Sequence, residues 1–127
     1  MRDAPVVSAV VLDANGLMMP FQFGVNLDAE LKRLFGDLPV VVPSSVLGEL
    51  ARSGDRRAKA ALALAGKYGS VGTDLSGDDA VMDVARRMSA AVLTNDRGLI
   101  RRLRAEGIPV VRLRSERYLE VSEHGVD

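Results

Sequence analysis

The chain has no cysteine and no tryptophan, and its single histidine is His124. Without cysteine, disulfides and thiolate metal sites are excluded, and one histidine leaves little room for imidazole chemistry. Any metal ion must therefore be held by oxygen. The apolar runs are far shorter than the roughly 20 residues of a membrane span, and residues 1–12 lack the layout of a signal peptide. The sequence predicts a cytoplasmic protein with no membrane segment.

An excess of charge of one sign is also missing, because 17 Lys and Arg balance 17 Asp and Glu. The distribution is less even, since residues 86–117 hold nine arginines and three acids. Such a cluster suits contacts with phosphates, although a solvated helix face is the alternative. Aromatic residues are few, which disfavours recognition of single-stranded nucleic acid by base stacking. The length predicts one domain, residues 1–121, followed by a short tail, residues 122–127.

Short apolar runs rich in β-branched residues alternate with helical patterns. This order is typical of an α/β fold, a three-layer α/β/α sandwich with a mainly parallel sheet of four to five strands. The predicted strands are Val6–Leu12, Val40–Val42, Val71–Thr73, Ala91–Thr94 and Val110–Leu113. The predicted helices are Leu27–Phe35, Ser44–Ala51, Arg56–Lys67, Asp78–Met88 and Arg97–Ala105.

Acidic residues follow four of these strands. Asp13 ends the first, Glu49 lies on the helix after the second, Asp78 and Asp79 open the helix after the third, and Asp96 follows the fourth. Ligand sites of open parallel sheets lie beyond the carboxyl ends of the strands, so the acids are expected to converge there. Clusters of carboxylates bind hard cations such as Mg²⁺ or Mn²⁺.

Each acid also has a purely structural interpretation. Asp13 is suited to capping a turn through its own backbone, and Asp96 to being the N-cap of a helix. Asp78 and Asp79 are favoured in a first turn by the helix dipole alone. Glu49, taken by itself, reads as an exposed helix residue. The functional interpretation rests on the common placement of the acids.

The segments "VVLDAN", "VPSSVLGELAR", "GDDAVMDVA" and "AVLTNDRGLIRRLRAEGIPVVRLR" resemble the successive motifs of PIN-domain nucleases. The resemblance covers roughly residues 6–114. It implies a metal-dependent endoribonuclease that hydrolyses RNA phosphodiester bonds with one or two Mg²⁺ or Mn²⁺ ions. The acidic quartet, both catalytic and metal-binding, then consists of Asp13, Glu49, Asp78 and Asp96.

Toxin-type members of this family often show a pattern like D-A-L-I-A-A-T-A, and laying "DDAVMDVA" on it pairs Asp78 with the acid. Helix geometry supports Asp78 as the third acid, because it shares a face with Val81 and Ala85 while Asp79 points about 100° away. Asp79 is the alternative, and Asp83 is disfavoured. Small polar side chains near the acids are expected to orient the carboxylates, namely Asn15, which is also a plausible turn former, and Thr94. Arginines at the start of the last helix are candidates for binding the RNA backbone, namely Arg97, Arg101 and Arg102.

Within the family, "LMMPFQFGVNLDAELKRL" and the closing "GIPVVRLRSERYLEV" resemble archaeal PIN proteins related to the nuclease that processes small-subunit ribosomal RNA. The expected substrate is then structured RNA, such as pre-rRNA. The alternatives are a VapC-type toxin with an antitoxin partner and a non-catalytic RNA- or protein-binding module. PIN relatives commonly form homodimers, so "LMMPFQF" is either a contact surface or part of the core.

Overall fold

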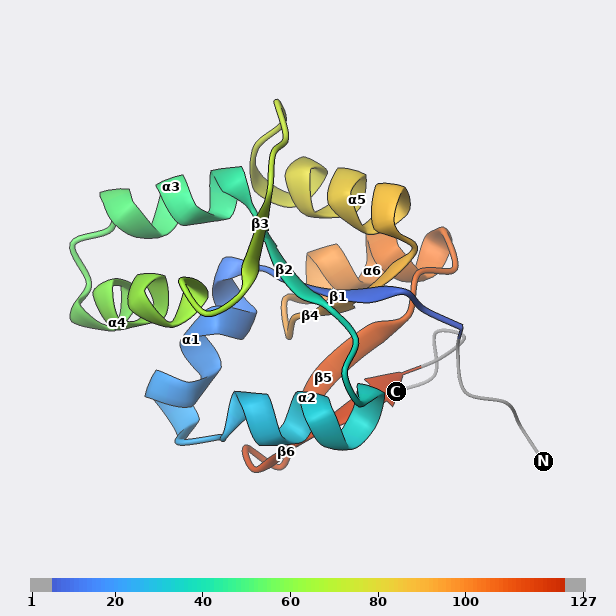
Figure 1. Cartoon of the computed structure of the whole chain (residues 1–127), viewed down its shortest axis with the longest axis horizontal. Helices are drawn as coiled ribbons and strands as arrows, with labels where there is room; N and C mark the ends of the chain where they lie inside the picture. The colour runs from blue at the N-terminus through green and yellow to red at the C-terminus, as the bar shows by residue number, and fades with distance from the viewer. Residues whose placement is uncertain (1–5, 123–127) are drawn as a thin grey trace.

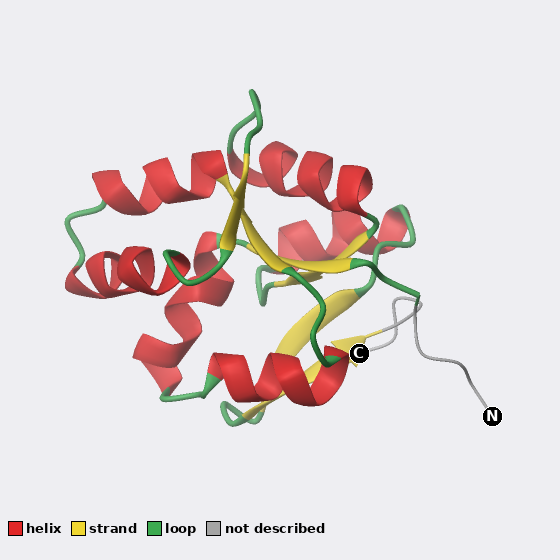
Figure 2. Cartoon of the chain, in the orientation of Figure 1, coloured by secondary structure: helices red, strands yellow, loops and turns green. Residues whose placement is uncertain are grey.

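The computed structural model describes residues 6–122 as one six-stranded sheet flanked by helices (Figures 1 and 2). The predicted tail, including His124, lies outside these residues except for Ser122. The strands are β1 (Ala9–Leu12), β2 (Val40–Pro43), β3 (Gly69–Val71), β4 (Ala90–Leu93), β5 (Val110–Arg114) and β6 (Tyr118–Ser122). The helices are α1 (Ala14–Phe23), α2 (Leu27–Phe35), α3 (Ser44–Arg52), α4 (Arg56–Ala65), α5 (Gly77–Met88) and α6 (Arg97–Ala105).

The strand order β3-β2-β1-β4-β5-β6 determines where a ligand site can form. The chain runs outward from β1 through β2 to β3, and then returns to the other side of β1 to form β4 and β5. The carboxyl ends of β1 and β4 therefore border the point where the order reverses, which is the usual binding crevice of a parallel sheet. The first five strands are parallel, as predicted.

The two central strands are entirely buried. Every residue of β1 and β4 is at most 2% exposed, because helices cover both faces of the sheet. In Figure 1, α5 lies above the central strands and α2 below them, while α1 lies to their left and α6 behind them. This burial explains the short, wholly apolar strand sequences and confirms the predicted α/β class.

Helix α1 is absent from the sequence prediction. It begins at its N-cap, Asp13, and ends at Gly24, whose φ of 73° suits glycine. Asn-Gly and Pro20 indicate a turn in the sequence, yet the helix continues past Pro20. The question raised by "LMMPFQF" has a divided answer: Leu17 and Met19 are in the core, whereas Phe21 and Phe23 are 39% and 42% exposed.

Strand β6 is a second correction, since four to five strands were predicted and the sheet has six. It pairs antiparallel with β5, with Leu119 opposite Leu113. The outer edge of β6 is satisfied by α2: Glu30 Oε1 accepts from the Leu119 amide at 2.8 Å, and Arg33 donates to its carbonyl at 2.7 Å. These side chains protect an otherwise unpaired strand edge.

Within residues 6–122, every helix is too short or too polar to cross a lipid bilayer.

Candidate active site

Two polar side chains are buried in the described part of the chain, and they are neighbours. Leu12 of β1 pairs with Leu93 of β4, so the next residue of each strand, Asp13 and Thr94, also lie beside one another. Asp13 is 8% exposed and Thr94 is fully buried. Because burial of polar groups costs free energy unless they are paired, the contacts of these two side chains at the crevice between β1 and β4 matter for stability.

Asp13 is both a helix cap and a perturbed acid. Its Oδ1 accepts from the Gly16 amide at 2.6 Å, which satisfies a free donor at the start of α1. Burial raises the pKa of Asp13 to about 7, and the negative charges of Asp78 and Asp96 also raise it. Hydrogen bonds from Thr94 and Gly16 lower the pKa without cancelling the effect of burial. An acid whose pKa is raised by burial and by specific neighbouring charges is a candidate for a functional site.

Thr94 links two of the acids. Its hydroxyl donates to the carboxylate of Asp13, and its Oγ1 accepts from the Asp96 amide at 3.0 Å. Asp96 in turn caps α6, since its Oδ1 accepts from the Leu99 amide at 3.0 Å. The predicted orienting role of Thr94 therefore has a concrete geometry.

The first turn of α5 brings in the third acid. The charge of Asp78 acts on Asp13, and the pKa of Asp78 is itself raised by desolvation and by the charge of Asp96. Asp79 instead forms an ion pair with Arg102 on α6, at 2.7 Å. Of the two alternatives, Asp78 is the one whose charge raises the pKa of Asp13, whereas the charge of Asp79 raises the pKa of Asp78.

Glu49 is the most peripheral member of the predicted quartet. It is exposed on α3, a helix that contacts both α1 and α5. It is not among the groups that shift the pKa of Asp13. The structure thus brings Asp13, Asp78 and Asp96 into mutual electrostatic contact and leaves Glu49 outside that set.

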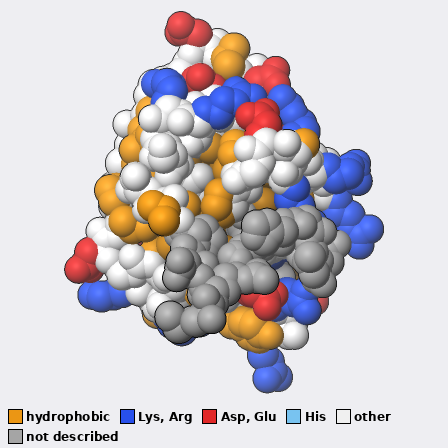
Figure 3. Space-filling view, turned by 90° about the vertical axis from the view of Figure 1, so that its right-hand side faces the viewer, with side chains coloured by type: hydrophobic (Ala, Val, Ile, Leu, Met, Phe, Trp, Pro, Cys, Tyr) orange, Lys and Arg blue, Asp and Glu red, His pale blue; other side chains and the backbone are white. Residues whose placement is uncertain are grey.

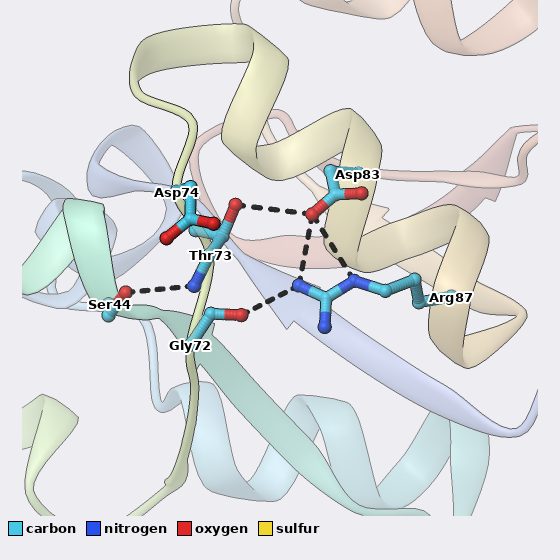
Figure 4. A pocket seen from close by; sticks show the side chains of 6 residues that line it. All are labelled: Ser44, Gly72, Thr73, Asp74, Asp83 and Arg87. Atoms are coloured by element: carbon cyan, nitrogen blue, oxygen red, sulfur yellow. Dashed lines mark hydrogen bonds and ion pairs between the residues drawn. The ribbon is translucent and has the colours of Figure 1, made fainter.

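Asp83 has a structural role on the same helix, as Figure 4 shows. Its carboxylate accepts from the Thr73 hydroxyl at 3.1 Å and pairs with Arg87 at 3.0 Å. Arg87 also donates to the Gly72 carbonyl at 2.7 Å, and Ser44 Oγ accepts from the Thr73 amide at 3.2 Å. These contacts fix the segment that leads into α5, and therefore the position from which the helix presents Asp78.

Asn95 was missed by the sequence analysis, although it belongs to the site's scaffold. Its side chain extends the pairing of β4 with β5: Oδ1 accepts from the Leu113 amide at 2.9 Å, and Nδ2 donates to the Leu113 carbonyl at 3.4 Å. Its own amide donates to Asn15 Oδ1 at 2.8 Å. Asn15 therefore ties the start of α1 to the loop that carries Asp96. The motif "TND" contains Asn95, but only the structure shows its contact with β5.

Gly16 is the second residue that was missed. A Cβ at this position would lie 2.8 Å from the Leu93 carbonyl oxygen and 3.3 Å from Asp13 Oδ1. Glycine is needed here because the first turn of α1 packs directly on the end of β4. The "DANG" segment indicates a turn in the sequence, whereas the close approach depends on tertiary packing.

The site can be tested for its fit to a divalent cation. Within residues 6–122, no three Asp, Glu or His side chains are spaced to enclose an ion. Mg²⁺ is commonly bound through one or two carboxylates while it keeps several waters. The mutual repulsion of Asp13, Asp78 and Asp96 is relieved by a cation. The donor set therefore fits a hydrated ion, and not a cage made only of protein ligands.

The sequence of this chain matches a family described as "PIN like domain" over residues 10–116. The chain therefore belongs to the PIN-like domain family, and the predicted resemblance is confirmed. No curated protein matches it. A solved structure of the PIN domain endonuclease Utp24 has 25% identity and a TM-score of 0.79, covering 94% of this chain and 96% of that one. The likeness to a PIN endonuclease extends over nearly the whole chain.

Proposed function

We propose that this protein is a divalent-metal-dependent endoribonuclease. The observation that carries the proposal is the buried Asp13 beside the charges of Asp78 and Asp96 at the crevice between β1 and β4. The structural likeness of the chain to a PIN endonuclease supports phosphodiester hydrolysis as the reaction. Mg²⁺ or Mn²⁺ supplies activation of water and neutralisation of phosphate charge at such a site.

The acids would divide the work of holding the ion. Asp13 and Asp96 are the direct ligands in this proposal. A backbone amide binds Oδ1 of each carboxylate and holds the side chain in place, and Oδ2 takes no part in that contact. Asp78 and Glu49, both exposed, bind the ion or orient its waters. Thr94 and Asn15 keep the carboxylates in place through the contacts described above.

The biological role we propose is the processing of ribosomal RNA, with structured pre-rRNA as substrate. This part rests on the sequence resemblance to archaeal processing nucleases and on the likeness to the Utp24 structure. A VapC-type toxin would use the same chemistry but would arrest growth on expression, with relief by an antitoxin. Expression with and without the product of the adjacent gene separates the two roles.

The chemistry is tested by incubating the protein with structured RNA and Mn²⁺. We expect cleavage by the wild type and none by the Asp13→Asn, Asp96→Asn double variant or in excess EDTA. Asp55→Asn is the matched control, because Asp55 also caps a helix through Oδ1 but on α4. Cleavage that persists in the double variant would refute the carboxylate mechanism. Binding without any cleavage would favour a non-catalytic module.

A further inference from the structure

A row of arginines lies along one face of α6. Arg97, Arg101 and Arg104 are four and seven residues apart, so they share that face with Ile100. Together with Arg112 of β5, these residues line a hollow of about 470 Å³. This volume is in the range of ordinary ligand sites. Arg104 and Arg112 were not among the arginines selected from the sequence.

Among residues 6–122, the side chains that line the hollow include no acid. Neighbouring arginines are held by carboxylates, as Arg86 is by Glu106 and Arg102 by Asp79, both at 2.7 Å. Within residues 6–122, neither Arg97 nor Arg101 has a carboxylate partner, and both are exposed. Arg102, although predicted from sequence to bind RNA, is therefore less available than these two.

The row begins beside the candidate active site, because Arg97 directly follows Asp96. From Arg97 to Arg104 a helix advances by roughly 10 Å, at about 1.5 Å per residue. Basic side chains gather at the right-hand margin of Figure 3. This margin corresponds to the back of the molecule in Figure 1, where α6 lies behind the sheet. Positive charge thus extends outward from the acids in one direction.

We propose that this hollow binds the phosphate backbone of RNA on one side of the scissile bond. The inference rests on the proposed function, since it takes the acidic site as the point of cleavage. Arginine suits this role because its planar fork binds phosphate oxygens in pairs. A strand whose phosphate lies at the acids continues directly onto Arg97 and Arg101. The hollow thereby fixes the path of the substrate without reading its bases.

The test measures binding of a fluorescein-labelled single-stranded oligoribonucleotide by anisotropy, in EDTA, at several salt concentrations. The variant is Arg97→Gln with Arg101→Gln. Its matched control is Arg56→Gln with Arg57→Gln, which removes the same charge from exposed positions on α4. If each arginine contacts one phosphate, the negative slope of log K against log salt becomes less steep by about 1.4 in the α6 variant, at about 0.7 per phosphate. The control keeps the wild-type slope.

An unchanged slope in the α6 variant would overturn the proposal, as would failure of the wild type to bind the RNA. A third outcome would also overturn it: the α6 variant loses binding of labelled polyglutamate but binds RNA as the wild type does. The hollow would then bind an acidic protein segment. Cleavage assays on the same proteins separate the two proposals. A wild type that binds through Arg97 and Arg101 but never cleaves refutes the nuclease only. Cleavage with α6-independent binding refutes the hollow only.

Discussion

Asp13→Asn is predicted to stabilise the metal-free protein at neutral and alkaline pH. Burial raises the pKa of Asp13 from 3.8 to about 7 in the folded state, and unfolding returns it to its ordinary value. Between those values the folded chain holds a proton that the unfolded chain releases, so stability falls as pH rises. Three pKa units correspond to about 4 kcal/mol, which is a large part of a typical domain's stability.

Asparagine imitates the protonated carboxyl group at this position. It preserves a side-chain oxygen for the Gly16 amide, and Asn and Asp are comparable N-caps. We expect the difference in free energy of unfolding between variant and wild type to widen by about 3 kcal/mol from pH 5 to pH 8. Groups common to both proteins cancel in this difference.

The assay is urea denaturation in EDTA, followed by circular dichroism at each pH. Asp55→Asn is the control, because it replaces an exposed aspartate N-cap with the same kind of backbone contact. It should show no such widening. A difference between Asp13→Asn and wild type that stays constant across the pH range would refute the argument from burial.

Two further predictions concern the scaffold. Gly16→Ala should cost about 1–3 kcal/mol of stability, because its Cβ would lie 2.8 Å from the Leu93 carbonyl oxygen. The control is Gly54→Ala, which has open space around it and should cost no such loss. Thermal unfolding compares the two variants, and equal losses would contradict the packing argument. Thr94→Val keeps the shape but removes the hydroxyl linking Asp13 to the α6 loop, so calorimetry should show Mn²⁺ affinity weakened by roughly 10- to 100-fold. Unchanged affinity would show that the hydroxyl does not position the acid.

Most helices were predictable because their signals are local. Helix α2 runs from Leu27 to Phe35 as predicted, with Asn26 at its N-cap accepting from the Ala29 amide at 3.1 Å. Amphipathic spacing and end signals of this kind need no knowledge of the rest of the fold. The wholly apolar sequences of β1 and β4 likewise required a sheet buried on both faces.

The elements that were missed depend on distant partners. Local signals in α1 favour a turn, whereas its apolar side chains pack in a core that is formed mostly by other elements. The edge of β6 is completed by Glu30 and Arg33, which are 89 and 86 residues from Leu119 in sequence. The role of Asn95 depends in the same way on a strand 18 residues away. No local pattern encodes such contacts.

The structural and functional interpretations of the acids prove to be compatible. Asp13 and Asp96 each cap a helix, and Asp78 lies in the first turn of a third. The positive ends of three helix dipoles thus lie at these acids, which offsets part of the repulsion between the carboxylates. Because backbone amides hold Asp13 and Asp96 in place, their position does not depend on a bound ion. An ion held in the proposed way would offset the cost of charging Asp13, and its binding would release a proton near neutral pH.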